Sequence, residues 1–214
     1  MKRIVVMISG SGSNLQTLIE QIHLKDVNAN IVCVISNKPD AYGLTRAEDA
    51  GIPNICVDST LSGRDREAYD QLLIDTIEMY QPDLIVLAGF MRILTDEFVA
   101  NYLGRLVNIH PSLLPKYKGL NTHQRAIDNG DIEHGVSVHF VTPKLDDGPV
   151  IIQAKVPIFV DDDADILAQR VQVQEHHIYP LVVKWFVEER LTMCSGKAMM
   201  DGQLLGMNGF ACDE

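Results

Sequence analysis

Two side chains that could act together in catalysis stand at the end of an apolar run. Asn108 and His110 flank Ile109, and Pro111 follows. In an extended strand, side chains at i and i+2 share a face, so the amide and the imidazole point the same way while Ile109 packs into the core. Pro111 disfavours helical backbone at His110 and ends the strand there. The pattern indicates a hydrogen-bond donor beside a proton-transfer group, although both residues could equally serve as structural hydrogen-bond partners.

A glycine loop, Ser9-Gly10-Ser11-Gly12-Ser13-Asn14, follows the first apolar run and opens an expected helix. Glycines allow close approach of a ligand, and helix-start N–H groups favour an anion. The dinucleotide fingerprint fails, because Leu15 stands where its third glycine would be. The nucleotide-binding P-loop fails too, because no Gly-Lys-Ser/Thr is present. A plain tight turn and a cradle for a single phosphate both remain open.

A third polar position is Asp146, in Leu145-Asp146-Asp147-Gly148-Pro149. Asp-Gly and Gly-Pro are ordinary turn chemistry, so the stretch by itself is mostly structural. The neighbours His176 and His177 lack the i, i+4 spacing of H-E-x-x-H. The sequence therefore predicts no metal site.

Composition narrows the class of protein. The chain has 214 residues, 46% hydrophobic, and a formal net charge of -11. Such a chain can bury a full core, and we expect one domain over residues 1–214, with halves at 1–110 and 111–214. The negative charge repels nucleic acid and anionic membranes. No C-x-x-C pair occurs among the four cysteines, Cys33, Cys56, Cys194 and Cys212, and no signal peptide precedes Ile4. We therefore expect the protein to be located in the cytoplasm.

The elements that must position these residues alternate in type. Strand-like apolar runs occupy residues 4–8, 31–35, 54–57, 84–88 and 106–109, and helical patterns lie near 14–24, 42–50, 65–80 and 95–102. This alternation predicts an α/β fold with a doubly wound, mostly parallel sheet. After residue 134 the period changes: strands are expected at 136–140 and 150–154, partly antiparallel, then a helix over 164–189 that Pro180 should kink, and a terminal hairpin.

Four segments in order resemble the phosphoribosylglycinamide formyltransferases of the formyl-folate transferase family, which have a Rossmann-like fold. They are Gly10 to Asn14, Leu87-Ala88-Gly89-Phe90-Met91-Arg92-Ile93-Leu94, Asn108 to Pro115 and Leu145 to Pro149. The Asn/His/Pro segment with a later Asp is shared by formyl-folate enzymes that act on other acceptors. The length of the chain and its glycine loop favour a small phosphorylated amine as acceptor. Asn121 departs from the pattern, because relatives commonly carry His there.

The resemblance implies a role for each matching residue. Asn108, His110 and Asp146 would be catalytic. Gly12, Ser13 and Asn14 would hold the acceptor's phosphate, and Glu175 would engage its ribose or amine side. The folate pocket would be formed by Arg66, Met91, Arg92, Ile93, Leu94 and Asn108.

The resemblance also implies the reaction: formyl transfer from 10-formyltetrahydrofolate, a co-substrate, to glycinamide ribonucleotide in de novo purine biosynthesis, without metal. Asn108 would donate to the oxyanion, His110 would assist proton transfer, and Asp146 would favour the imidazolium. The expected partners are small molecules, with no nucleic acid and no membrane, and the protein would be a monomer or weak homodimer. Hydrolysis of formyl-folate, or a non-catalytic nucleotide- or folate-binding module, are the alternatives.

Overall fold

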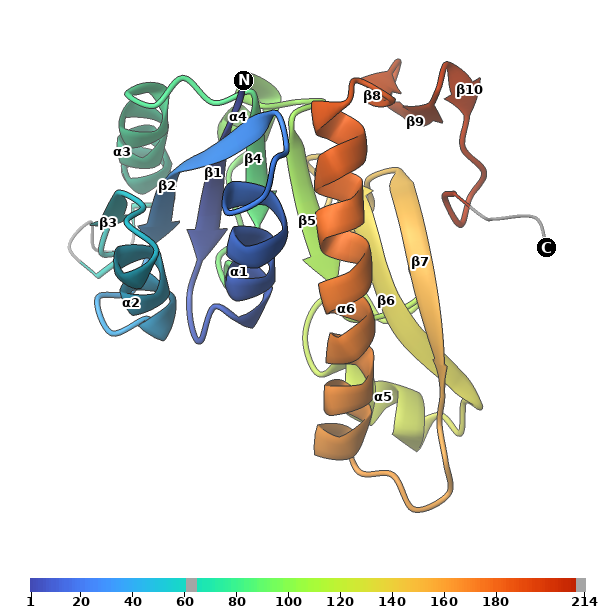
Figure 1. Cartoon of the computed structure of the whole chain (residues 1–214). Coiled ribbons are helices and arrows are strands. Elements are labelled where there is room, and N and C mark those ends of the chain that lie inside the picture. The colour runs from blue at the N-terminus through green and yellow to red at the C-terminus, as the bar shows by residue number, and fades with distance from the viewer. Residues whose placement is uncertain (61–64, 211–214) are drawn as a thin grey trace. The chain divides into compact units, whose positions relative to one another are not determined.

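The computed structural model describes residues 1–60 and 65–210 (Figure 1). Cys212, one of the four cysteines, lies outside the described residues. The chain divides into two compact units, Met1–Val107 and Asn108–Glu214. Each unit is described by itself below. The single domain over 1–214 stays a prediction.

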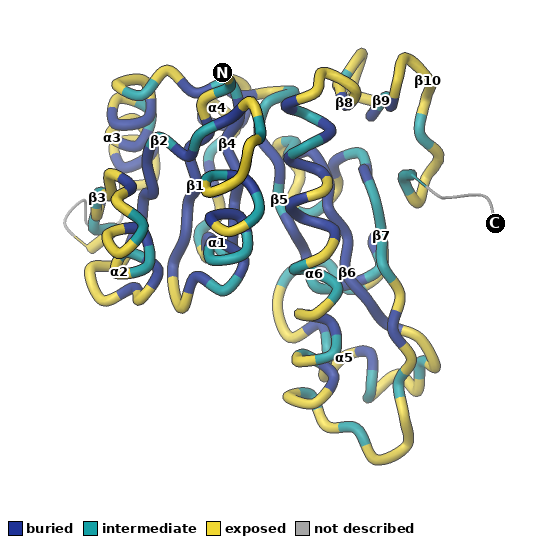
Figure 2. Tube along the Cα trace, viewed as in Figure 1, coloured by how far each residue is buried: buried dark blue, intermediate teal, exposed yellow. Residues whose placement is uncertain are grey.

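The first unit is built on parallel strands in the order β3-β2-β1-β4. Their bounds are β1 (Lys2–Ile8), β2 (Ala29–Ser36), β3 (Asn54–Cys56) and β4 (Leu84–Leu87). Every residue of Ile4–Ile8 and of β4 is buried, as Figure 2 shows. Strands covered on both faces need continuous apolar runs rather than alternation, which is why the sequence pattern identified them.

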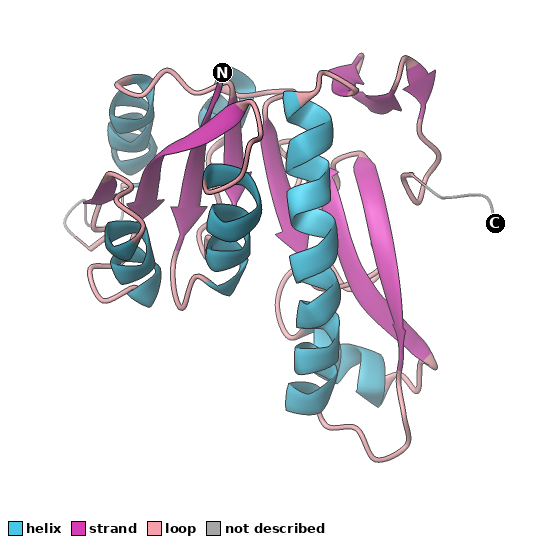
Figure 3. Cartoon of the chain, in the orientation of Figure 1, coloured by secondary structure: helices cyan, strands magenta, loops and turns pink. Residues whose placement is uncertain are grey.

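The helices of the first unit are α1 (Ser13–Leu18), η1 (Ile19–His23), α2 (Tyr42–Asp49), α3 (Arg66–Glu78) and α4 (Asp96–Asn101). α1 lies in front of the strands in Figure 3, and α4 lies behind them. Two of the helices begin at a side-chain cap: Asp65 accepts from Ala68 N, and Thr95 accepts from Phe98 N. Each cap satisfies a helix-start N–H that has no partner within the helix.

The second unit contains strands in the order β5-β6-β7, with β6 and β7 antiparallel. Their bounds are β5 (Leu106–His110), which starts at the end of the first unit, β6 (Glu133–Phe140) and β7 (Val150–Pro157). The long helix α6 (Ala164–Val187) contacts both β6 and β7. It continues through Pro180, so the expected kink does not end the helix there.

Two features at the ends of this unit differ from the expectation. The C-terminal part forms three antiparallel strands, not a simple hairpin: β8 (Leu191–Cys194), β9 (Lys197–Met200) and β10 (Gln203–Leu204). A short helix, α5 (Thr122–Asp128), was not expected. Its seven residues bury only Thr122 and Ala126, too few apolar positions to give a periodic signal. The predicted α/β class, with antiparallel additions in the C-terminal part, is confirmed.

Candidate active site

Asn108 lies on β5 beside a histidine that the sequence analysis did not single out. Asn108 Nδ2 is 3.2 Å from His139 Nε2, and His139 Nδ1 is 2.8 Å from the Phe140 carbonyl oxygen. A carbonyl only accepts, so His139 Nδ1 carries the proton and Nε2 accepts from Asn108. Burial lowers the pKa of His139 to about 4, which keeps the ring neutral. His139 thus fixes which end of the Asn108 amide is nitrogen, and the second N–H of that amide can serve a ligand.

His110, two residues along the strand, uses both ring nitrogens. Nε2 is 2.9 Å from the Tyr117 carbonyl oxygen, so it carries a proton. Nδ1 is 3.5 Å from Asp146 Oδ2, and the two side chains are only 7% and 8% exposed. His110 therefore has a carbonyl oxygen at one ring nitrogen and a carboxylate at the other.

Asp146 is held at this place by the backbone. Its Oδ2 accepts from Gly119 N at 2.9 Å, and its Oδ1 lies 3.8 Å from His139 Nε2. Asp146 itself has φ 47°, in the left-handed region, where Asp is tolerated better than most residues. A Cβ on Gly148 would collide with the Phe140 carbonyl, so glycine fixes the path of the loop. The structure therefore brings Asn108, His110 and Asp146 into one cluster within the second unit.

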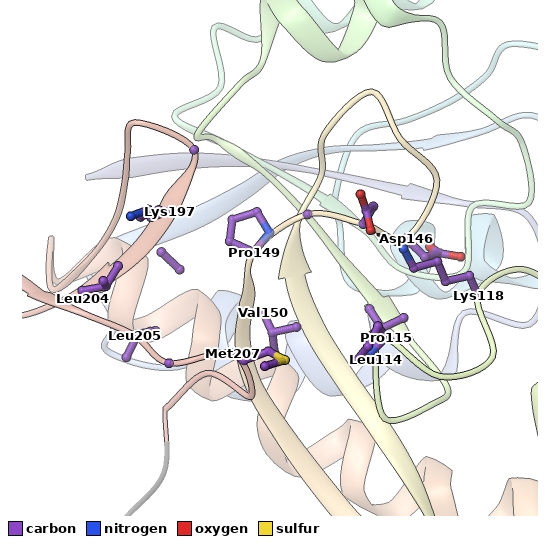
Figure 4. Close-up of a pocket in the computed structure, with 15 residues that line it drawn as sticks. Leu114, Pro115, Lys118, Asp146, Pro149, Val150, Lys197, Leu204, Leu205 and Met207 are labelled. Carbon is purple, nitrogen blue, oxygen red and sulfur yellow. Dashed lines mark hydrogen bonds and ion pairs between the residues drawn. The ribbon is translucent and has the colours of Figure 1, made fainter.

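An open pocket of about 390 Å³ adjoins the Asp146 loop. Figure 4 shows Asp146 and Lys118 on one side of it and Lys197 and Leu204 on the other. Lys118 Nζ pairs with Asp147 Oδ1, and this bond lowers the pKa of Asp147. Asp147 is thus engaged with a lysine, whereas its neighbour Asp146 faces the two histidines.

The glycine loop lies in the first unit, packed against α2. Gly12 has φ 70°, and a Cβ there would lie 2.8 Å from Gly43 Cα. Gly43 N donates to Gly10 O at 3.0 Å, and Arg46 Nε donates to Ser11 O at 2.8 Å. Arg46 brings a positive charge to the loop that the sequence analysis did not identify. The loop therefore forms a tight turn that packs closely against α2. Ser13 and Asn14 begin α1 at the end of this turn.

The segment expected to contact folate follows β4. Met91 and Ile93 are 68% and 57% exposed, whereas Leu94 is buried. Exposed large apolar side chains side by side in a loop are available to an apolar ligand. The segment thus offers apolar contact from two of its four residues.

Two arginines assigned to the same pocket hold this segment in place. Arg66 donates to Ile93 O at 3.0 Å and lines an open pocket of about 630 Å³. The guanidinium of Arg92 stacks 4.0 Å from the centre of the Tyr69 ring. Both cations therefore support the loop in addition to any contact with a ligand.

Three further positions complete the placement of the sequence predictions. Glu175 is half-buried on α6, in the second unit, whereas the glycine loop is in the first. Asn121 is exposed at φ 56° directly before α5, a left-handed backbone conformation that Asn adopts more easily than most residues. His123 Nδ1 lies 3.1 Å from His134 Nε2.

Across the described ranges, no cluster of three or more His, Cys, Asp or Glu residues could hold a metal ion.

His139 could have been found from the sequence. Val136, Val138 and Phe140 alternate with Ser137 and His139, so the strand period already placed this histidine away from the apolar face. What the sequence could not give is the distance from His139 to Asn108, because that depends on how β6 lies relative to β5.

The formyl transferase family model matches residues 2–183. The chain belongs to the formyl transferase family. It is an enzyme, a formyltransferase, and the predicted family is confirmed. It is 56% identical over 212 residues to the phosphoribosylglycinamide formyltransferase of Escherichia coli (strain K12), covering 99% of both chains. It is also 50% identical to that of Haemophilus influenzae, again over 99% of both chains.

Solved structures give the same likeness. The phosphoribosylglycinamide formyltransferase of Coxiella burnetii superposes with a TM-score of 0.92 at 49% identity, over 97% of each chain. The glycinamide ribonucleotide transformylase 1 of Symbiobacterium toebii gives a TM-score of 0.89 at 38% identity, over 94% of each chain. In the described part of this formyltransferase, no helix has the length and apolar character needed to cross a membrane.

Proposed function

We propose that this formyltransferase moves the formyl group of 10-formyltetrahydrofolate onto the amine of glycinamide ribonucleotide, giving formylglycinamide ribonucleotide and tetrahydrofolate in purine biosynthesis. The observation that carries the proposal is the cluster of Asn108, His110 and Asp146 in the second unit. The full-length likeness to phosphoribosylglycinamide formyltransferases supports the choice of acceptor.

The reaction needs neither a metal nor a protein nucleophile. The lone pair of the neutral amine attacks the formyl carbon, and a C–N bond forms as the carbonyl becomes a tetrahedral oxyanion. Collapse of this intermediate breaks the bond to the folate nitrogen. The attacking nitrogen loses a proton and the leaving nitrogen gains one. The enzyme's part is positioning, charge stabilisation and proton transfer.

The cluster has a group for each of these tasks. The second N–H of Asn108 donates to the oxyanion, since the first is held by His139. His110 donates from Nε2 once a formyl oxygen replaces the Tyr117 carbonyl as its partner. Asp146 pairs with His110 and takes up the amine proton through water, and His110 delivers a proton from Nε2 to the leaving folate nitrogen.

The substrate subsites are assigned from the family resemblance, and local chemistry supports the phosphate site. Gly12, Ser13 and Asn14 hold the acceptor's phosphate, because a glycine loop followed by a helix start favours an anion, and Arg46 adds a positive charge there. Glu175 engages the ribose or amine side of the acceptor.

Formyl-folate is the co-substrate, bound by the exposed Met91 and Ile93 with Arg66, Arg92, Leu94 and Asn108. We place the enzyme in the cytoplasm, with small molecules as its partners and no need of metal or nucleic acid.

The deciding experiment incubates the protein with 10-formyltetrahydrofolate, with and without glycinamide ribonucleotide, and follows both products. Formyl transfer requires tetrahydrofolate and formylglycinamide ribonucleotide to appear in equal amounts, and only when the acceptor is present. Tetrahydrofolate and formate released without acceptor would identify a hydrolase instead. Binding of both ligands without either product would identify a binding module.

A further inference from the structure

The loops after three adjacent strands are joined by one serine hydroxyl. In the sheet of the first unit, β1 lies between β2 and β4. Ser9 directly follows β1, Asn37 directly follows β2, and Met91 lies in the loop after β4. The carboxyl ends of parallel strands meet at one edge of a sheet, which is the edge that binds ligands in this class of fold.

The hydrogen bonds have a defined direction. Ser9 Oγ is 2.5 Å from Asn37 Oδ1, and Met91 N is 2.7 Å from Ser9 Oγ. Oδ1 can only accept, so the hydroxyl proton goes to Asn37, and a lone pair of the same oxygen accepts the Met91 N–H. Ser9 and Asn37 are 5% and 4% exposed, so water cannot easily replace either bond.

The Ser9 hydroxyl connects the two proposed substrate subsites. Ser9 is the first residue of the glycine loop, and Met91 begins the segment Met91–Leu94 that is assigned to folate. A ligand that fixes the glycine loop also fixes Ser9, and Ser9 holds the backbone of Met91. The reverse holds for a ligand at the folate segment, because coupling between two sites is reciprocal.

We propose that Ser9 is a positioning residue that couples the phosphate subsite of the acceptor to the folate subsite, with Asn37 orienting its hydroxyl. The proposal rests on the proposed function, because that function assigns the two subsites. Neither substrate needs to touch Ser9. The coupling is carried by one hydrogen bond, so the expected size is about two- to tenfold in affinity, the net contribution of a single hydrogen bond.

The test is a titration of the unmodified enzyme with tetrahydrofolate, with and without saturating glycinamide ribonucleotide, followed by calorimetry. This product and acceptor cannot react, so both affinities can be measured at equilibrium. We expect the acceptor to change the affinity for tetrahydrofolate by about two- to tenfold. In Ser9→Ala the two affinities should become equal. In steady-state assays, Ser9→Ala should raise both KM values more than it lowers kcat.

Ser36→Ala is the matched control. Ser36 is fully buried at the end of β2, and its hydroxyl also makes two bonds, donating to Lys38 O at 2.8 Å and accepting from Lys38 N at 3.0 Å. Those bonds stay within one loop, so Ser36→Ala should lower the melting temperature much as Ser9→Ala does while leaving the coupling intact. If Ser9→Ala does not fold, Asn37→Ala removes the partner of the hydroxyl proton and should reduce the coupling.

Three outcomes would overturn the proposal: no coupling in the unmodified enzyme, coupling unchanged in Ser9→Ala, or equal loss of coupling in Ser36→Ala. Failure of the proposed function is a separate result. It would show as unmodified enzyme that makes no formylglycinamide ribonucleotide, whatever the titrations give.

Discussion

The orientation of the Asn108 amide depends on which ring nitrogen of His139 carries the proton. Because His139 donates from Nδ1 to the Phe140 carbonyl, its Nε2 must accept, and Asn108 must present nitrogen to it. The same reasoning gives His110 a proton on Nε2, opposite the Tyr117 carbonyl. Two carbonyl oxygens of the main chain therefore set the tautomers on which the proposed chemistry depends.

The first prediction concerns Asn108→Ala, which removes the donor to the oxyanion. Turnover should fall by about 100- to 1,000-fold, the usual loss for one preorganised oxyanion donor. Both substrates should still bind, because the lost hydrogen bond to the oxyanion forms mainly in the transition state. The measurements are kcat and the two binding constants, with circular dichroism as the check on folding. Near-normal turnover would remove Asn108 from the mechanism.

The second prediction concerns Asp146→Asn, which keeps an oxygen for Gly119 N and removes the negative charge beside His110 Nδ1. The uncharged amide cannot take up the amine proton, so the maximum turnover should drop. The measurement is kcat across the full pH range.

Asp147→Asn is the control for this change, since Asp147 pairs with Lys118 instead of a histidine. Its pH profile should match that of the parent. Matching profiles for Asp146→Asn and the parent would show that Asp146 has only a structural role in its turn.

The glycine loop, as an element, is fixed from α2. Gly12 approaches Gly43 so closely that neither tolerates a side chain, and Arg46 ties the loop to the helix. The packing against α2 therefore sets the path of the loop where a ligand would meet it.

The third prediction follows from this packing. Gly12→Val should lower the free energy of unfolding by about 2 kcal/mol or more, since a left-handed conformation and an overpacked contact each cost on the order of 1–3 kcal/mol. In the protein that remains folded, acceptor binding should weaken much more than folate binding. Urea unfolding and separate binding titrations measure the two effects. Equal weakening of both ligands would contradict the phosphate assignment.

The fourth prediction concerns the contact between α5 and β6. Burial lowers the pKa of His134 from 6.5 to about 4 and also lowers that of His123. Folding thus favours the neutral rings, so the stability they contribute is complete above about pH 6.5 and is lost as the pH falls towards 4. The free energy of unfolding, measured between pH 7.5 and 4.5, should therefore drop less in His134→Gln than in the parent. An identical drop in both proteins would show that this pair does not titrate on unfolding.

For the whole molecule, the net charge determines which class of anionic ligand can bind. The net charge is -11 over 214 residues, so any anion must be bound locally against the overall field. A glycine loop with one arginine suits a single phosphate, whereas a nucleic acid would need an extended basic surface.

The fifth prediction uses this difference. Transfer RNA or duplex DNA should not inhibit turnover even at low salt, where phosphate contacts are strongest, because the protein repels a polyanion. Glycinamide ribonucleotide should bind at the same salt concentration. Assays at low and physiological ionic strength, with and without polyanion, decide this. Inhibition by RNA that disappears with salt would point to a basic surface and against the proposed acceptor.

The sequence by itself determined the elements and the residue types. β1 and β4 were apolar runs and were recognised because strands buried on both faces need continuous apolar sequence. The spacing of Asn108 and His110 placed both on one face of β5, because side chains alternate along any strand. The glycine loop was likewise found from its local chemistry.

The tertiary structure decided which of these residues meet. Asp146 looked like an ordinary turn residue, and its ion pair with His110 depends on a loop path set by the Gly119 amide and by Gly148. His139 reaches Asn108 from β6, a strand 31 residues away in sequence. α5 was missed because its seven residues carry no apolar period of their own. Local patterns report how one segment is buried, whereas a contact between segments distant in sequence depends on the packing of all the others.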